Sequence, residues 1–201
     1  MVFPHLANVA FLILGFAFVR IITSCTSLIA IQKNNTKETV KFYWPHSLFI
    51  FITIFTMILF WWTAVPLQDV KFFPDESWNL FTYILFLAVP MLMMFISEVV
   101  IPYEHDKKSV DLKEYYYKYH GVILGLAWIL QVFLIGNFFV FYNQGDLISA
   151  KVIGRLIMLC IMAPMIFSSN KRLHEIGMSI FFLGFVYTII KYHIFLVNSN
   201  F

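Results

Sequence analysis

Two long stretches of this chain, residues 42–68 and 119–145, contain no Asp, Glu, Lys or Arg. Each is longer than the ~20 predominantly apolar residues that an α-helix needs to cross a bilayer. The composition agrees, because 61% of the residues are hydrophobic, only 12% are charged and the mean hydropathy is +0.81. So few charges cannot cover a water-facing surface. The sequence therefore predicts a polytopic integral membrane protein.

Hydrophobic runs of spanning length occur six times along the 201 residues. The alternation of apolar and polar residues typical of a membrane β-barrel is absent, so helices are the expected way to satisfy the backbone in lipid. We predict an all-α membrane protein, a single domain over 1–201, that forms a six-transmembrane-helix bundle with short loops. The predicted spans are 7–31, 46–66, 78–101, 121–142, 148–167 and 176–197. A re-entrant segment is the alternative for the fifth run, because it carries Lys151, Arg155 and Pro164.

The Lys and Arg residues between the predicted spans indicate an orientation, because cytoplasmic loops retain an excess of them. The first, third and fifth loops hold the larger basic set, namely Lys33, Lys37, Lys41, Lys107, Lys108, Lys113, Lys118, Lys171 and Arg172. We therefore expect both termini on the non-cytoplasmic side of a multi-pass protein of the cell (inner) membrane. The basic residues form no continuous face, so nucleic acid is not an expected partner.

Arg20 is the most informative single residue, because a charge near the middle of a spanning helix costs ~2.5 to 3.5 kcal/mol on insertion scales. Thr23, Ser24 and Ser27 follow at helical spacing, so Arg20 begins a polar stripe that we expect to face the bundle interior. Glu98 is the only acidic residue within a predicted span and is the expected partner. The pair predicts either a polar cavity or conduction path, or a structural ion pair joining two helices.

Three further polar residues lie within or at the edges of the spans. Gln131, at mid-depth of the fourth, lines the same cavity or bonds across helices. Arg155 and Lys191 lie a turn or two inside the outer boundary, where the simplest expectation is that their side chains snorkel to the headgroups. With Arg20 and Lys151, these two cations outnumber the single acid Glu98, so the outer half of a pathway would attract anions rather than cations.

Histidines begin each helix that enters from the predicted cytoplasmic side: His46, His120 and His174. Neutral imidazole is a common metal ligand, so these three are weak candidates for a metal or haem site. No two of them are three or four residues apart, and no HxxxH motif rich in carboxylates accompanies them. The spans and histidines loosely resemble those of di-haem b-type cytochromes, but the paired histidines of the central helices are missing. We predict no metal and no cofactor.

Motifs for nucleophilic triads, phosphate-cradling loops, paired catalytic carboxylates and zinc proteases are absent, so we assign no catalytic residue and favour a non-enzyme. The preferred hypothesis is a channel or transporter-like bundle, a homo-oligomer in the lipid bilayer, that passes or binds a small solute or ion through a polar interior. One alternative is a sensor or anchor subunit that binds a protein partner through the cytoplasmic segment 102–120. A second is a membrane-embedded enzyme that modifies lipid or holds haem or a metal.

Overall fold

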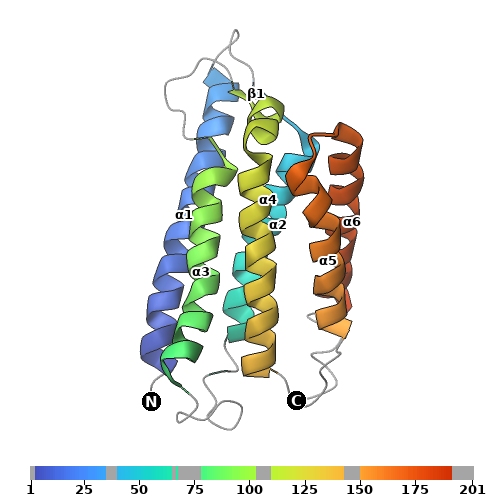
Figure 1. Ribbon diagram of the computed structural model, residues 1–201. Coiled ribbons are helices and arrows are strands. Elements are labelled where there is room, and N and C mark those ends of the chain that lie inside the picture. The colour runs from blue at the N-terminus through green and yellow to red at the C-terminus, as the bar shows by residue number, and fades with distance from the viewer. Residues whose placement is uncertain are drawn as a thin grey trace.

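The computed structural model describes residues 3–34, 40–64, 67, 78–102, 110–142 and 150–191, and within them the chain is almost entirely helical. The prediction of an all-α protein is confirmed. The elements in chain order are α1 (Phe3–Asn34), β1 (Val40–Lys41), α2 (Trp44–Ala64), α3 (Leu80–Val100), β2 (Val110–Asp111), α4 (Leu112–Asn137), η3 (Phe138–Tyr142), α5 (Ala150–Phe167) and α6 (Lys171–Ile189). The helices run alongside one another, and α1 begins at the same end of the bundle at which α6 finishes (Figure 1).

Four of the described helices, α1, α2, α3 and α4, are long and apolar enough to cross a membrane. A shorter apolar helix, Val152–Phe167, forms most of α5. The sixth helix, α6, begins with Lys171 and Arg172, about one turn earlier than the predicted span at 176. The structure thus confirms helices that are long and apolar enough to cross a membrane, but it does not fix the number of spans at six or the side on which the termini lie.

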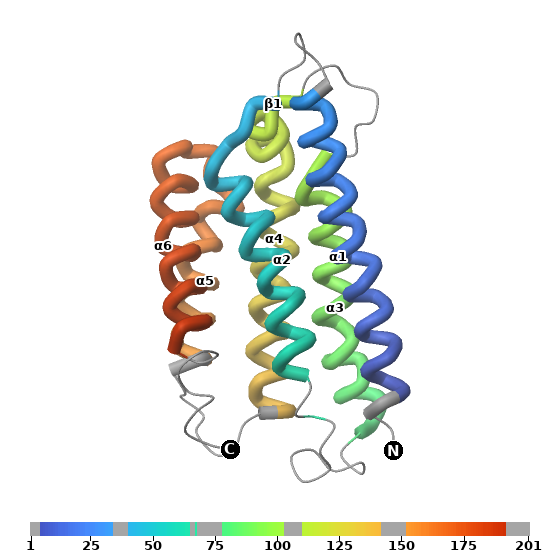
Figure 2. Tube along the Cα trace, turned by 180° about the vertical axis from the view of Figure 1, so that it is seen from behind, coloured from blue at the N-terminus to red at the C-terminus, as the bar shows by residue number. Residues whose placement is uncertain are grey.

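The helices form a closed ring in the order α1, α3, α4, α5, α6, α2, with α2 returning to α1. Figure 2 shows α2 between α6 and α1 from behind. Helix α2 also contacts α3 and α4 across the ring. The most extensive contact joins α1 to α3, so this pair defines one side of the bundle.

The buried side of α1 repeats with a spacing of three and four residues and consists largely of small side chains. Its members are Ala7, Ala10, Leu14, Ala17, Ile21, Ser24 and Leu28. Helices in lipid associate mainly by close van der Waals packing, and small residues let the two backbones approach. Helix α3 presents a matching series, Thr82, Phe86, Val89, Met93, Ile96 and Val100. The interior along α1 is therefore filled by packed side chains.

A short two-stranded sheet joins two loops at one end of the bundle. We call this the basic end, because Lys33, Lys41, Lys113 and Lys171 lie there. Strands β1 and β2 pair in parallel, and Lys41 lies 3.5 Å from the carboxylate of Asp111. Asp111 also begins α4 by accepting the backbone N–H groups of Lys113 and Glu114. These backbone donors lower the pKa of Asp111, because they stabilise its charged form.

Candidate functional site

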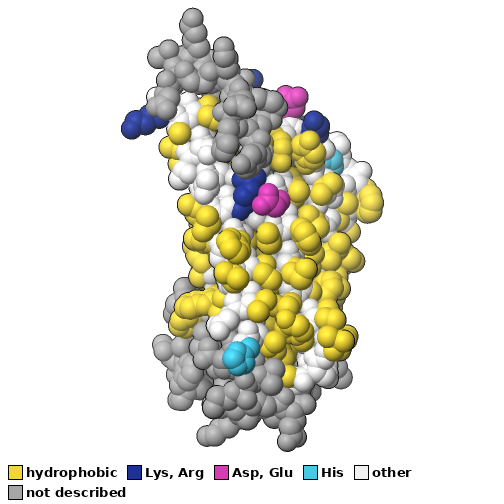
Figure 3. Space-filling view, turned by 90° about the vertical axis from the view of Figure 1, so that its left-hand side faces the viewer, with side chains coloured by type: hydrophobic (Ala, Val, Ile, Leu, Met, Phe, Trp, Pro, Cys, Tyr) yellow, Lys and Arg dark blue, Asp and Glu magenta, His cyan; other side chains and the backbone are white. Residues whose placement is uncertain are grey.

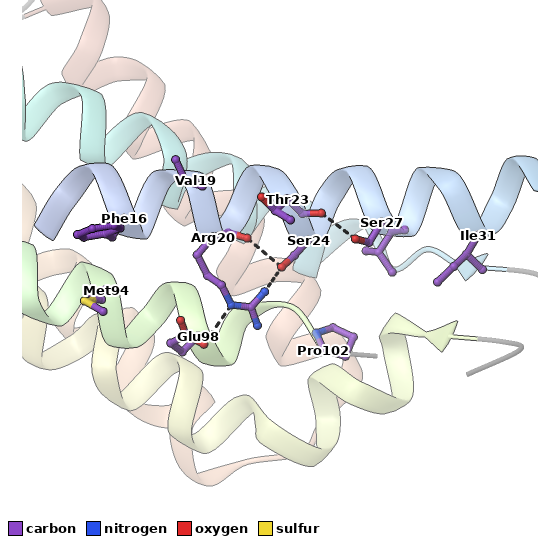
Figure 4. A pocket seen from close by; sticks show the side chains of 11 residues that line it. Phe16, Val19, Arg20, Thr23, Ser24, Ser27, Ile31, Met94, Glu98 and Pro102 are labelled. Carbon is purple, nitrogen blue, oxygen red and sulfur yellow. Dashed lines mark hydrogen bonds and ion pairs between the residues drawn. The ribbon is translucent and has the colours of Figure 1, made fainter. Parts of the chain in front are cut away.

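A groove of about 380 Å³ runs between α1 and α3. It is lined by Phe16, Val19, Arg20, Thr23, Ser24, Ser27, Leu28, Ile31, Met94, Glu98 and Pro102. Its middle is polar and its two ends are hydrophobic. Figure 4 shows Phe16 and Met94 on one side of the polar middle, and Ile31 and Pro102 on the other. The polar stripe expected from the sequence therefore lines one side of this groove.

Arg20 contacts Glu98, the partner expected from the sequence. The Nε atom of Arg20 donates to Oε2 of Glu98 at 3.0 Å, and Nη1 donates to the hydroxyl of Ser24 (Figure 4). The Ser24 hydroxyl in turn donates to the backbone oxygen of Arg20 at 2.9 Å. The Arg20 side chain is 15% exposed and that of Glu98 is 51% exposed. The arginine is thus packed between the helices while the carboxylate reaches the outer surface.

Of the polar stripe that Arg20 begins, Ser24 is buried as expected whereas Thr23 is exposed, so the stripe faces the bundle interior only in part. Phe16 and Val19, which flank it in the groove, are 58% and 60% exposed. In the space-filling view of this side, a basic and an acidic side chain lie together on a largely hydrophobic surface (Figure 3). The small residues of α1 occupy the positions that face the bundle interior. Arg20, next to the buried Ile21, therefore lies at the edge of the contact between α1 and α3. The groove opens sideways from the bundle.

Two hydroxyl groups of the groove, those of Ser24 and Ser27, donate to their own helix. Ser27 donates to the backbone oxygen of Thr23 at 2.9 Å, as Ser24 does to that of Arg20. A hydroxyl that has used its hydrogen in this way still offers lone pairs. A carboxylate likewise accepts several hydrogen bonds, and Glu98 meets Arg20 through one of its two oxygens. The middle of the groove therefore offers acceptors on Glu98 and Ser27 beside the guanidinium of Arg20.

The remaining polar candidates lie away from the groove. Gln131 accepts a hydrogen bond from Nη1 of Arg155 at 2.9 Å, between α4 and α5. Lys191 follows the end of α6 and places its ammonium 5.4 Å from the centre of the Tyr187 ring. Neither cation lies among the residues that line the groove. Of the two alternatives given for Gln131, the structure shows the bond across helices, and Gln131 is not among the residues that line the groove of Arg20 and Glu98.

The three histidines gather near the basic end, and each uses at least one ring nitrogen in a hydrogen bond within the protein. His46 is paired through Nε2 with the backbone oxygen of Val100 at 2.6 Å. The two ring nitrogens of His174 meet the Tyr116 hydroxyl at 2.8 Å and the backbone oxygen of Ser168 at 2.6 Å. Among the described residues, no group of three or more His, Cys, Asp or Glu is arranged to hold a metal ion. A metal at His174 would require breaking one of these bonds.

His120 and the tyrosines that precede it complete an aromatic cluster that the sequence reading missed. The rings of His120 and His174 are 5.1 Å apart, and Tyr43 and Tyr117 share a hydrogen bond of 2.8 Å. Tyr116 is fully buried among these rings. The signal in the sequence is the group of tyrosines directly before His120, at positions 115, 116, 117 and 119. Because Tyr116 packs inside the bundle, less of the segment 102–120 is left to bind a partner.

We expect acid to destabilise the protein through His174. Burial lowers the pKa of His174 from its ordinary value of 6.5, because desolvation penalises the charged ring. The unfolded chain binds a proton on this ring more readily than the folded one, so its contribution is complete above about pH 6.5 and declines below it. The midpoint of thermal unfolding should be lower at about pH 5 than at about pH 7.5. The variant His174→Gln should show a smaller difference, and an unchanged difference would contradict this assignment.

Comparison of this chain with protein-family models, with curated proteins and with solved structures gives no match. The chemistry of the groove therefore has to be argued from its own residues.

Proposed function

We propose that this protein binds an amphiphilic molecule of the bilayer in the groove between α1 and α3. The observation that carries the proposal is the ion pair of Arg20 and Glu98, which opens sideways between exposed hydrophobic side chains. A polar head at Glu98 and a hydrocarbon chain along Phe16, Val19 and Met94 would match the polar and apolar parts of the groove. Sites for small molecules combine an apolar lining with a few polar groups in this way.

The head group should carry hydrogen-bond donors and little net charge. Arg20 and Glu98 have opposite charges, so the pair offers a dipole and no excess of either sign. The oxygens of Glu98, Ser24 and Ser27 favour a hydroxyl or amine over a group that only accepts. We therefore propose a lipid with an alcohol or amine head.

The depth of the groove supports a ligand from the leaflet at the basic end. Glu98 lies in the last turn of α3, about 5 Å before Ile101 at a rise of ~1.5 Å per residue. Six spans with both termini non-cytoplasmic would make this the cytoplasmic leaflet. The contacts of α5 and α6 within the ring support six helices in one bundle. Passage of a solute through the bundle, a homo-oligomer and the inner membrane remain predictions from the sequence.

The proposal is tested by filling the groove without touching its ion pair. Ser27→Leu should weaken binding of phosphatidylethanolamine and diacylglycerol about tenfold, because the larger side chain occupies the site and removes an acceptor. Thr26→Leu is the matched control, since Thr26 is exposed on the same helix and does not line the groove. Native mass spectrometry of the purified protein, titrated with each lipid, measures the retained ligand.

Phosphatidylcholine serves as the reference lipid, because its head group has no N–H or O–H donor. Wild-type protein should retain it less than phosphatidylethanolamine. Equal retention of both lipids, or equal binding by the Ser27→Leu and Thr26→Leu variants, would refute the groove as the site.

A further inference from the structure

The sequence predicts that the Arg155 side chain reaches the headgroups, but in the structure it contacts α4. It lies on the side of α5 that also carries the buried Val152 and Met162, and it points its guanidinium to Gln131 of α4. Its side chain does not extend along α5 toward the nearer end of the bundle. The expectation that Arg155 snorkels to the outer headgroups is therefore wrong.

The depth of Arg155 follows from the register of α4 against α5. The indole of Trp128 donates to the backbone oxygen of Leu159 at 3.2 Å, and Gly121 faces the backbone of Ile166. The two helices run antiparallel, so Arg155 is level with Gln131. That level is ~10 residues, or about 15 Å, from Gly121. Arg155 thus lies near the middle of the predicted fourth span, although it is only about 8 Å from the start of α5.

No carboxylate accompanies this cation within the described ranges. Their acidic residues are Glu98, Asp111, Glu114 and Glu175, all near the basic end. Three of them pair with other cations, namely Arg20, Lys41 and Lys171. A guanidinium carries five N–H donors, and its one hydrogen bond here goes to a neutral amide. A cation this deep in an apolar bundle normally marks a functional site.

We infer that Arg155 and Gln131 bind the carboxylate or phosphate group of a ligand between α4 and α5. The planar guanidinium can donate two parallel hydrogen bonds to two oxygens of such a group. The ammonium of a lysine, which acts as a point charge, cannot. Gln131 holds the guanidinium through its oxygen, and its amide nitrogen supplies a further donor. The ligand approaches from the end of the bundle opposite the basic end, where α5 begins (Figure 1). This site is independent of the groove between α1 and α3.

The test uses the full-length protein and reads its thermal unfolding. In detergent micelles at constant ionic strength, sodium phosphate and sodium acetate are titrated separately. In nanodiscs, phosphatidylglycerol is compared with phosphatidylcholine. A saturable rise in the unfolding midpoint with phosphate or acetate identifies a soluble oxyanion as the ligand. A rise only with phosphatidylglycerol identifies a lipid headgroup.

In either case Arg155→Gln should abolish the rise, while Arg172→Gln should keep it. Arg172 is the matched control, because it is exposed at the start of α6. If Arg155→Gln fails to fold, Arg155→Lys keeps the charge and should bind the same probe roughly tenfold more weakly, since it lacks the planar fork. Dependence of the rise on Arg155 separates the site from the groove, because Arg155 does not line the groove.

Two results would overturn the inference. The first is that neither phosphate, acetate nor phosphatidylglycerol produces a rise that depends on Arg155. The second is that Arg155→Lys binds the effective probe as tightly as the wild type does.

Discussion

Replacing Glu98 with leucine is expected to lower the free energy of unfolding by about 2 kcal/mol, the usual scale for a hydrogen bond to a charged group. The change removes the carboxylate that Nε of Arg20 contacts at 3.0 Å. Arg20 would keep its positive charge within a helix of high hydropathy. The loss should appear as a lower midpoint of thermal unfolding in detergent.

The double variant Arg20→Leu/Glu98→Leu should be more stable than the sum of the two single changes predicts. Removing both charges abolishes the desolvation cost that either charge bears alone. Glu114→Leu is the control for loss of a carboxylate, because Glu114 is exposed in the first turn of α4. Additive effects of the two single changes would show that the ion pair contributes nothing specific. A stable double variant that no longer retains phosphatidylethanolamine would assign the pair to ligand binding as well.

Ala17→Leu should be the most damaging single substitution on α1. Ala17 is completely buried in the series of small residues through which α1 packs on the bundle. A leucine there forces the helices apart or into strained rotamers, at a typical cost of about 1 to 3 kcal/mol. Because α1 packs mainly on α3, the separation should also weaken the contact between Arg20 and Glu98.

Val19→Leu is the matched control for this second prediction. Val19 lies two residues away and is 60% exposed, so a larger side chain meets no packed neighbour. Thermal unfolding, followed by tryptophan fluorescence, should show a lower midpoint for Ala17→Leu and little change for Val19→Leu. Equal midpoints for the two variants would mean that the close approach at Ala17 is not needed.

The sequence predicts the helices well, because the reason for them is local. A long apolar segment in lipid has to satisfy its own backbone groups, so the uncharged runs around α2 and α4 lead directly to helices. The partner of Arg20 could also be predicted, because Glu98 is the only acidic residue in any predicted span. Both inferences need only composition and the spacing of residues along the chain.

The orientation of the helix faces was harder to predict, because polarity and side-chain size give opposite indications. The polar residues from Arg20 to Ser27 suggested an inward stripe, whereas Ala7, Ala10 and Ala17 mark the buried face. Of the stripe, Ser24 alone belongs to that face. In a membrane the small residues are the better signal, since close packing rather than polarity selects the contact face. The depth of Arg155 depends on the register between α4 and α5, which the sequence of either helix alone does not contain.

The contact between Arg20 and Glu98 also has a consequence for biosynthesis. The two residues are separated by 78 positions in the chain. At a synthesis rate of ~5 to 20 residues per second, Arg20 is made about 4 to 16 s before Glu98. During that interval α1 has a charged residue near its middle and lacks the helix on which it mainly packs. We expect α1 to stay at the insertion machinery until α3 is complete, so that the two helices leave it together.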